Sequence, residues 1–161
     1  MLHLVFTKRI LPVIILFLAI SFSGFANMPF NKGEVEKYRG TEWKLYKEVD
    51  GLQIFFKFEE RHDLKHGIHK EYLLIRFNNT TNNNLEINWK DEIWYDEKCV
   101  SCQSSNNEFN KKITINSGQS FEGDCNANIL PELKIHSKFL NYDLEELTNY
   151  EMTDLKVSQL N

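Results

Sequence analysis

The clearest pattern in the chain is an alternation of apolar and polar positions over residues 42–59, with Asp50-Gly51 at its centre. Asp-Gly favours a two-residue type I′ turn, because both central residues need positive φ. If these two residues form the turn, the pairing register of the flanking strands is set. The predicted cross-strand pairs are Val49 with Leu52, Lys47 with Ile54, Leu45 with Phe56 and Trp43 with Phe58. Seven of these eight residues are apolar and share one face, so the turn and the pattern predict the same hairpin.

A second hairpin is predicted from residues 72–89. Residues 72–77 are apolar on both faces, as in a central strand, and residues 78–84 are rich in Asn, which favours turns. Leu85, Ile87 and Trp89 then alternate with polar residues. Further strands are predicted over residues 93–95, 109–115, 133–139 and 150–157, and a single helical turn over residues 143–147. About eight short strands without βαβ spacing predict an all-β fold, a single antiparallel β-sandwich.

Two segments resemble a known group of domains. The stretch YLLIRFNNTTNNNLEINW, followed by ITINSGQSFEG, is similar to the small immunoglobulin-like sandwich domains of exported bacterial proteins. The resemblance covers residues 72–123 and implies an immunoglobulin-like topology. Many members of that group lack an assigned activity, so it implies no catalytic residue.

The first 26 residues have the three parts of a secretory signal peptide. Lys8 and Arg9 precede an apolar run over residues 10–22, and Gly24 and Ala26 supply the small residues before a cleavage site. The apolar run is shorter than the roughly 20 residues that span a bilayer, and no later run is long enough to do so. We therefore predict a signal peptide over residues 1–26, a loose lead-in over 27–40 and the sandwich over 41–161. The mature protein is expected to be periplasmic or extracellular, without a membrane span.

The charge of the chain argues against a nucleic-acid partner. The net charge is −4, and removal of Lys8 and Arg9 leaves 17 basic and 23 acidic residues, or −6. Binding to phosphates requires clustered Lys and Arg, and doublets such as Lys111-Lys112 are isolated.

Three cysteines follow the predicted signal: Cys99, Cys102 and Cys125. Export into an oxidising compartment favours a disulfide. A structural zinc site needs four ligands, and only three cysteines are present. A redox dithiol is disfavoured because Cys99 and Cys102 precede a loop and not a helix. A bridge to Cys125 closes the longer loop, which is worth about 3 kcal/mol in chain entropy, and so constrains the unfolded chain more than the short Cys99–Cys102 loop does. We predict Cys102–Cys125, with Cys99 free and buried; Cys99–Cys125 and Cys99–Cys102 are the alternatives.

His62, His66 and His69 lie within eight residues and are the only candidate metal ligands of note. Gly67 and the strands predicted on both sides indicate a solvated loop, for which zinc or copper is expected to leave the melting temperature unchanged. The alternative is a zinc or copper site.

The carboxylate pairs Glu59-Glu60, Asp91-Glu92 and Glu145-Glu146 are adjacent in sequence. Neighbours on a strand point to opposite faces, so one pair cannot flank a scissile bond, and solvated surface is the expected environment. A hydrolase would need residues that converge from several strands.

Aromatic residues form 13% of the chain, and Trp94 and Tyr95 follow closely after Trp89. Such residues usually fill a sandwich core. If Trp89 and Ile93 point inward, however, Trp94 and Tyr95 form a patch that binds a carbohydrate or a partner protein.

These observations together predict an exported, non-catalytic binding or structural module without a cofactor. The alternatives are an envelope metal-binding protein that uses the histidine-rich loop and a hydrolase assembled from several strands.

The signal peptide leads to a direct test. We expect the mature protein to begin at Asn27, because the small-x-small exit lies immediately before it. Amino-terminal sequencing of the exported protein measures this, and a mature chain that retains residues 2–25 would contradict it.

Overall fold

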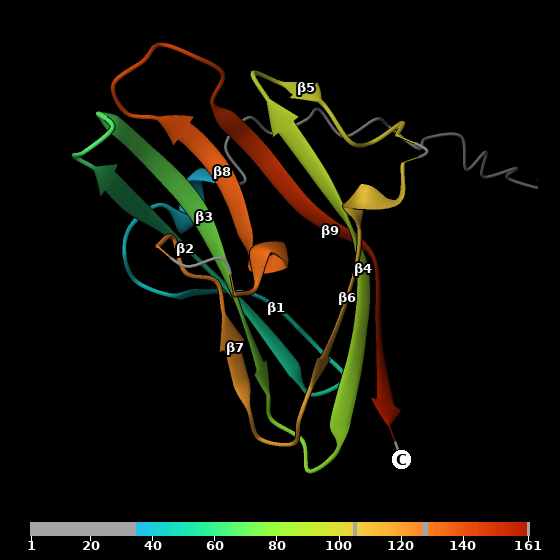
Figure 1. Ribbon diagram of the computed structural model, residues 1–161. Coiled ribbons are helices and arrows are strands. Elements are labelled where there is room, and N and C mark those ends of the chain that lie inside the picture. The colour runs from blue at the N-terminus through green and yellow to red at the C-terminus, as the bar shows by residue number, and fades with distance from the viewer. Residues whose placement is uncertain (1–34, 105, 127–128, 161) are drawn as a thin grey trace, which may run out of the picture. The chain divides into compact units, whose positions relative to one another are not determined.

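The strands form two antiparallel sheets that face each other (Figure 1). The computed structural model describes residues 35–104, 106–126 and 129–160. The first sheet contains β1 (Lys44–Val49), β2 (Leu52–Asp63), β3 (Ile68–Asn79), β7 (Ser120–Glu122) and β8 (Lys134–Phe139). The second sheet contains β4 (Asn84–Tyr95), β5 (Lys98–Cys99), β6 (Asn110–Ile115) and β9 (Leu147–Leu160). Three short 3₁₀ turns complete the described elements: η1 (Glu36–Tyr38), η2 (Asn107–Phe109) and η3 (Pro131–Leu133).

Each sheet is built around one central strand. In the first sheet, β3 pairs with β2, while β7 and β8 pair with successive parts of β3. In the second sheet, β4 pairs along its whole length with β9, and with β6 and β5. The chain changes sheet after β3, after β6 and after β8. The predicted all-β antiparallel sandwich is therefore confirmed, with nine strands in the described residues.

Three local predictions were wrong. β3 and β4 do not form a hairpin, because they belong to different sheets and the Asn-rich segment connects one layer to the other. The strand predicted over residues 93–95 is the end of a continuous β4. No helical turn forms over residues 143–147, where irregular chain leads directly into β9.

The β1–β2 hairpin confirms the turn and half of the register. Asp50 and Gly51 have φ of 49° and 80°, as a type I′ turn requires. The pairs Val49–Leu52 and Lys47–Ile54 form as predicted, but a bulge then shifts the register, so that Lys44 and not Leu45 faces Phe56. A bulge moves the following side chains to the other face. Leu45 is consequently 51% exposed.

The bulge places Tyr46 of β1 in the core, where its ring stacks on Phe56 at a centroid distance of 4.2 Å. The backbone N–H of Met152 in β9 donates to the Tyr46 hydroxyl at 3.5 Å. β1, at the edge of the first sheet, therefore contacts β9, at the edge of the second.

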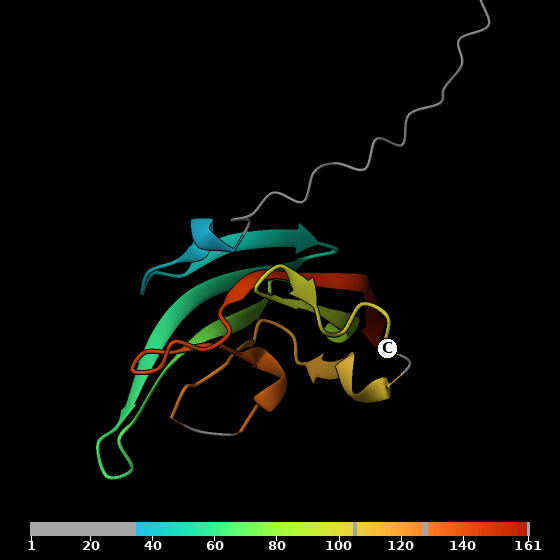
Figure 2. The same cartoon turned by 90° about the horizontal axis from the view of Figure 1, so that it is seen from above.

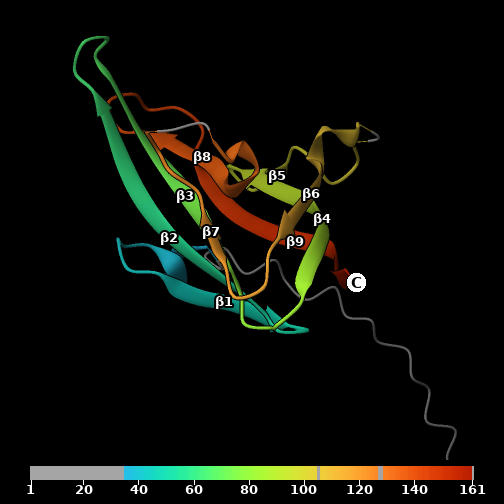
Figure 3. The ribbon, with the colours of Figure 1, turned by 60° about the horizontal axis from the view of Figure 1, so that its bottom comes forward.

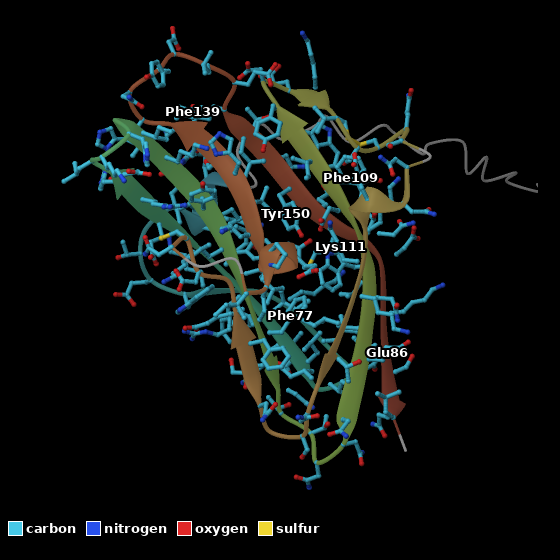
Figure 4. The ribbon with its side chains drawn as sticks, in the orientation of Figure 1. Phe77, Glu86, Phe109, Lys111, Phe139 and Tyr150 are labelled. Carbon is cyan, nitrogen blue, oxygen red and sulfur yellow. A yellow bond between two sulfur atoms is a disulfide. The ribbon has the colours of Figure 1, made fainter. Side chains whose placement is uncertain are left out.

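The core consists of the inward rows of both sheets. Figure 4 shows Phe77 and Tyr150 between the layers, and the edge of the Phe77 ring meets Trp89 at a centroid distance of 5.2 Å. The inward rows of β2, β3 and β4 are Leu52, Ile54, Phe56, Phe58, Leu73, Ile75, Phe77, Leu85, Ile87, Trp89 and Ile93. Part of the predicted lead-in also packs here, since Val35 and Tyr38 are buried in the same cluster. Residues 1–34, which include the predicted signal peptide, lie outside the described residues.

Asn79 holds the connection between the two layers. Its buried side-chain amide donates to the carbonyls of Asn83 and Asn116, at 2.8 Å and 3.0 Å. Its side-chain oxygen accepts hydrogen bonds from the backbone N–H and hydroxyl of Thr81. One residue thus fixes the β3–β4 crossover and attaches it to the β6–β7 turn.

Asp91 is buried, although solvated surface was expected for it. It is 1% exposed, and its Oδ1 accepts hydrogen bonds from Trp89 Nε1 and the Tyr150 hydroxyl, both at 2.7 Å. Lys111 Nζ lies 4.0 Å from Oδ2. Burial raises the pKa of Asp91, and the hydrogen bonds from Tyr150 and Trp89 oppose that rise. The carboxyl group links β4 to β9 in an otherwise apolar row.

This buried group provides a test of the core. Asp91→Ala should lower the free energy of unfolding by about 2–5 kcal/mol, because two buried donors lose their acceptor. Asp91→Asn keeps an oxygen acceptor and should lower the free energy of unfolding clearly less than Asp91→Ala does. Chemical denaturation of both variants measures the difference.

The same variants test the pKa shift. The folded state holds the Asp91 proton more tightly than the unfolded state, so this stabilisation is present below the ordinary pKa of 3.8. The stabilisation is lost as the pH rises from 3.8 through the raised pKa of Asp91. Asp91→Asn should therefore gain stability relative to the parent over that interval. A pH-independent difference would contradict the assigned shift.

Candidate binding site

An apolar pocket of about 370 Å³ lies beside β8. Its lining residues come from the end of β4, from β8 and from the loop between β8 and β9: Tyr95, His136, Phe139, Leu144 and Glu145. We call it the edge pocket, because β8, which contributes His136 and Phe139 to the lining, pairs with β3 alone among the described strands. Figure 4 shows Phe139 at the end of β8.

Aromatic rings continue from the edge pocket in both directions. His136 contacts Tyr72 and Phe139 edge to face, with centroid distances of 5.8 Å and 4.9 Å. Phe139 in turn contacts Tyr142 at 5.9 Å, and Lys70 Nζ lies 4.8 Å from the Phe139 centroid. These contacts hold Phe139 in one orientation, so one wall of the pocket is already formed.

Two polar groups of the pocket are buried. The Tyr95 hydroxyl donates to the His136 carbonyl at 2.6 Å, and burial raises the pKa of Tyr95 to about 12. His136 Nδ1 is buried without a hydrogen-bond partner among the described residues. Burial and Lys70 lower the pKa of His136, so its ring is neutral at neutral pH. The side of the pocket formed by Tyr95 and His136 is therefore uncharged at neutral pH.

The loop of residues 140–146 carries exposed apolar side chains, of which Leu144 lines the pocket. Leu140, Tyr142 and Leu144 are all exposed, Tyr142 by 56% and Leu144 by 61%. Figure 1 shows this loop joining β8 to β9 at one end of the sandwich. Apolar side chains in such a cluster are typical of an interaction site.

Both ends of this loop are held in place. The backbone N–H of Leu140 donates to the His69 carbonyl at 2.9 Å, and the Asn141 side chain donates to the Gly67 carbonyl at 2.9 Å. At the other end, Lys138 Nζ donates to Glu146 Oε1 at 2.8 Å, and Arg39 forms ion pairs with both Glu146 and Glu71. The exposed side chains therefore stand on a fixed support.

The two predicted aromatic binding residues are separated by the structure. Tyr95 lines the edge pocket, whereas Trp94, on the opposite face of β4, is half-buried and does not line it. Sequence reasoning missed His136, Phe139 and Leu144. Their alternation predicted only a strand and a loop, and the pocket depends on the contact between β8 and the end of β4.

A second pocket, of about 410 Å³, is charged. Lys57, Glu59, Glu122 and Asp124 line it beside Leu130. Lys57 already pairs with Glu59, and Arg76 pairs with Glu122. Lys57, Glu59 and Glu122 thus already form ion pairs within the first sheet, so we take the edge pocket as the candidate site.

The structure pairs Cys99 with Cys102 and not Cys102 with Cys125. The sulfur atoms of Cys99 and Cys102 lie together, with Cα atoms 5.7 Å apart, in the turn that follows β5. Cys125 is buried against Tyr72 and Leu74 on the outer face of the first sheet. The arrangement differs from the predicted Cys102–Cys125 bridge, because Cys102 lies in the turn after β5 of the second sheet, whereas Cys125 packs against the outer face of the first sheet.

Burial raises the pKa of Cys125 to about 11, and the hydrogen bond that it donates to Glu59 adds to the rise. The group is therefore a thiol at neutral pH, and thiols are poor nucleophiles.

The three histidines are only partly brought together. His62 and His69 face each other across β2 and β3, whereas His66 lies in the turn and binds Asp63 through Nδ1 at 2.9 Å. In the described parts of the chain, no three His, Cys, Asp or Glu side chains are grouped so as to hold a metal ion.

The chain matches no protein-family model, and no curated protein or solved structure is significantly similar to it. No helix among the described residues is long and apolar enough to cross a membrane. The fold and the site thus define a two-sheet antiparallel β-sandwich domain with an apolar pocket at one strand edge.

The cysteine arrangement can be tested by alkylation under non-reducing conditions. We expect Cys125 to resist alkylation in the folded protein, because its thiol is buried and protonated, and to react once the protein is unfolded. Cys99 and Cys102 should remain joined until a reductant is added. Peptide mapping by mass spectrometry measures this, and a peptide that links Cys102 to Cys125 would contradict it.

Proposed function

We propose that the protein is an exported, non-catalytic binding module that receives an apolar side chain of a partner protein in the edge pocket. The observation that carries the proposal is the apolar cavity of about 370 Å³ that the exposed Leu144 lines, in a loop that also exposes Leu140 and Tyr142. Protein interfaces concentrate their energy in such places, where a large side chain fills a pocket surrounded by apolar contacts.

Preorganisation supports this function. Binding costs less when the receiving surface does not have to become ordered. The ring contacts of Phe139 and the ion pairs of Glu146 hold the two sides of the pocket before a partner arrives. The energy of burying an apolar side chain can therefore contribute directly to affinity.

The chemistry of the lining favours a protein side chain over a sugar. Sugar hydroxyls need hydrogen-bond partners, and the Tyr95 hydroxyl is already bonded to the His136 carbonyl. The Glu145 carboxylate is the remaining polar side-chain group of the lining, because His136 Nδ1 is buried. A carbohydrate partner is thus the less suited of the two predicted ligand classes.

Export and the immunoglobulin-like topology belong to the same proposal. The signal-like residues 1–26 and the close Cys99–Cys102 pair suit an oxidising compartment outside the cytoplasm. Two antiparallel sheets, repeated changes of sheet, and pairing between strands distant in sequence, as in β3–β8 and β4–β9, are in keeping with an immunoglobulin-like sandwich.

The hydrolase alternative receives less support. Ser137 donates its hydroxyl to Glu71 Oε1 at 2.8 Å, a pairing that resembles a nucleophile with its base. Ser137 is fully buried, and Arg39 forms an ion pair with Glu71. A substrate has no access to this hydroxyl, and the Glu71 carboxylate is already paired with Arg39.

A matched pair of leucine variants tests the proposal. Photo-crosslinking from p-benzoylphenylalanine in place of Tyr142, in the native envelope, should identify the partner by mass spectrometry. Leu144→Asp should then weaken binding of the purified partner by more than about tenfold, because a carboxylate enters the apolar contact. Leu45→Asp is the control, since Leu45 is similarly exposed but lies on β1, at the opposite edge of the first sheet.

Equal affinities of the partner for both variants would contradict the role of the edge pocket. Loss of binding to a glycan, and not to a protein, in Leu144→Asp would keep the pocket but overturn the protein partner. Thermal melting of each variant confirms that it is folded.

A further inference from the structure

The β2–β3 hairpin brings two histidines into direct opposition. His62 and His69 are cross-strand partners in the register of the two strands. Directly opposed residues have Cβ atoms about 4.5–5.5 Å apart, so their side chains meet on one face. Nδ1 of His62 lies 2.8 Å from Nδ1 of His69. The sequence indicated a solvated loop here, but both residues lie on regular strand.

The proton between the two rings can be assigned to one of them. His62 Nε2 lies 3.2 Å from Glu60 Oε2, and a carboxylate at this distance favours a proton on Nε2. With this proton on Nε2, the lone pair on Nδ1 of His62 can accept the Nδ1 proton of His69. A metal ion can take the place of this proton, provided that His69 carries its own proton on Nε2 instead.

The two nitrogens are close enough to become adjacent ligands of one metal ion. Two nitrogens bound at about 2.0 Å and at right angles to each other are about 2.8 Å apart, as in a square-planar or tetragonal site. Tetragonal nitrogen sites are typical of copper(II) and nickel(II), and copper(II) binds most tightly among divalent ions.

We propose that His62 and His69 form a surface site for a divalent transition-metal ion, with copper(II) preferred. The two Nδ1 atoms are the protein ligands, and water or another molecule completes the coordination. Glu60 acts as the carboxylate that orients a ligand histidine, a common partner in metal sites. This proposal does not rest on the function proposed for the edge pocket.

The position of the hairpin leaves the site accessible. The tip of the β2–β3 hairpin extends past the rest of the first sheet (Figures 2 and 3). The side chains of His62 and Glu60 are 50% and 54% exposed. Asp63 does not compete for His62, because it binds both the Nδ1 and the backbone N–H of His66. His66 is therefore a natural control.

The test uses copper(II) chloride and single-alanine variants of the mature chain, whose expected start at Asn27 excludes His3. The parent should bind one copper(II) ion, with the superhyperfine pattern of two nitrogens in its electron paramagnetic resonance spectrum. His62→Ala or His69→Ala should weaken binding by about 100-fold, because the second ligand of a chelating pair is lost. Glu60→Ala should weaken it by about tenfold.

His66→Ala should leave both the affinity and the spectrum unchanged. A similar loss in His66→Ala, or unchanged affinity in a His62→Ala/His69→Ala double variant, would overturn the proposal. Copper should also raise the melting temperature of the parent saturably, and not that of the double variant. Melting with a chelator present shows that the variants fold, which keeps loss of the site distinct from loss of the fold.

Discussion

The domain depends on the burial of one face of β3 against one face of β4. These are the central strands of the two sheets, and every other strand except β1 pairs with one of them, while β1 pairs with β2. Phe77 and Trp89 meet across the layers, and Asn79 fixes the short connection between the two strands. The Asn-rich segment therefore joins the two central strands through a hydrogen-bonded turn.

The edge pocket follows from the way in which the sandwich ends. β8 presents a free strand edge, whose backbone groups need partners when they are buried. Tyr95 supplies one of them through its bond to the His136 carbonyl, and its ring extends from the second sheet to the first. The Tyr95 side chain alone fills the space between the two sheets only in part. The remaining space is the cavity beneath Leu144 that we propose as the binding site.

The β2–β3 hairpin illustrates a second consequence of unequal strand lengths. Phe58 and Leu73 are the last fully apolar pair on its inward face, and the next inward pairs are Glu60 with Glu71 and His62 with His69. The hairpin therefore continues beyond the core, where its inward face meets solvent or the polar network around Arg39. Regular strand geometry persists there without apolar burial, and it holds two imidazoles opposite each other more rigidly than a loop would.

The sequence by itself determined the features that depend on neighbours in the chain. Asp50-Gly51 specified its turn, and the alternation in residues 52–58 and 85–89 identified the buried faces correctly, because a period of two is a local property. Tertiary structure alone decided which strands share a sheet, and hence that β3 and β4 separate and that Cys102 lies far from Cys125. It also decided the burial of Asp91, whose partner Tyr150 is 59 residues away. Alternation shows which face of a strand is buried, but the atoms that cover this face come from distant segments, and only the folded chain brings them together.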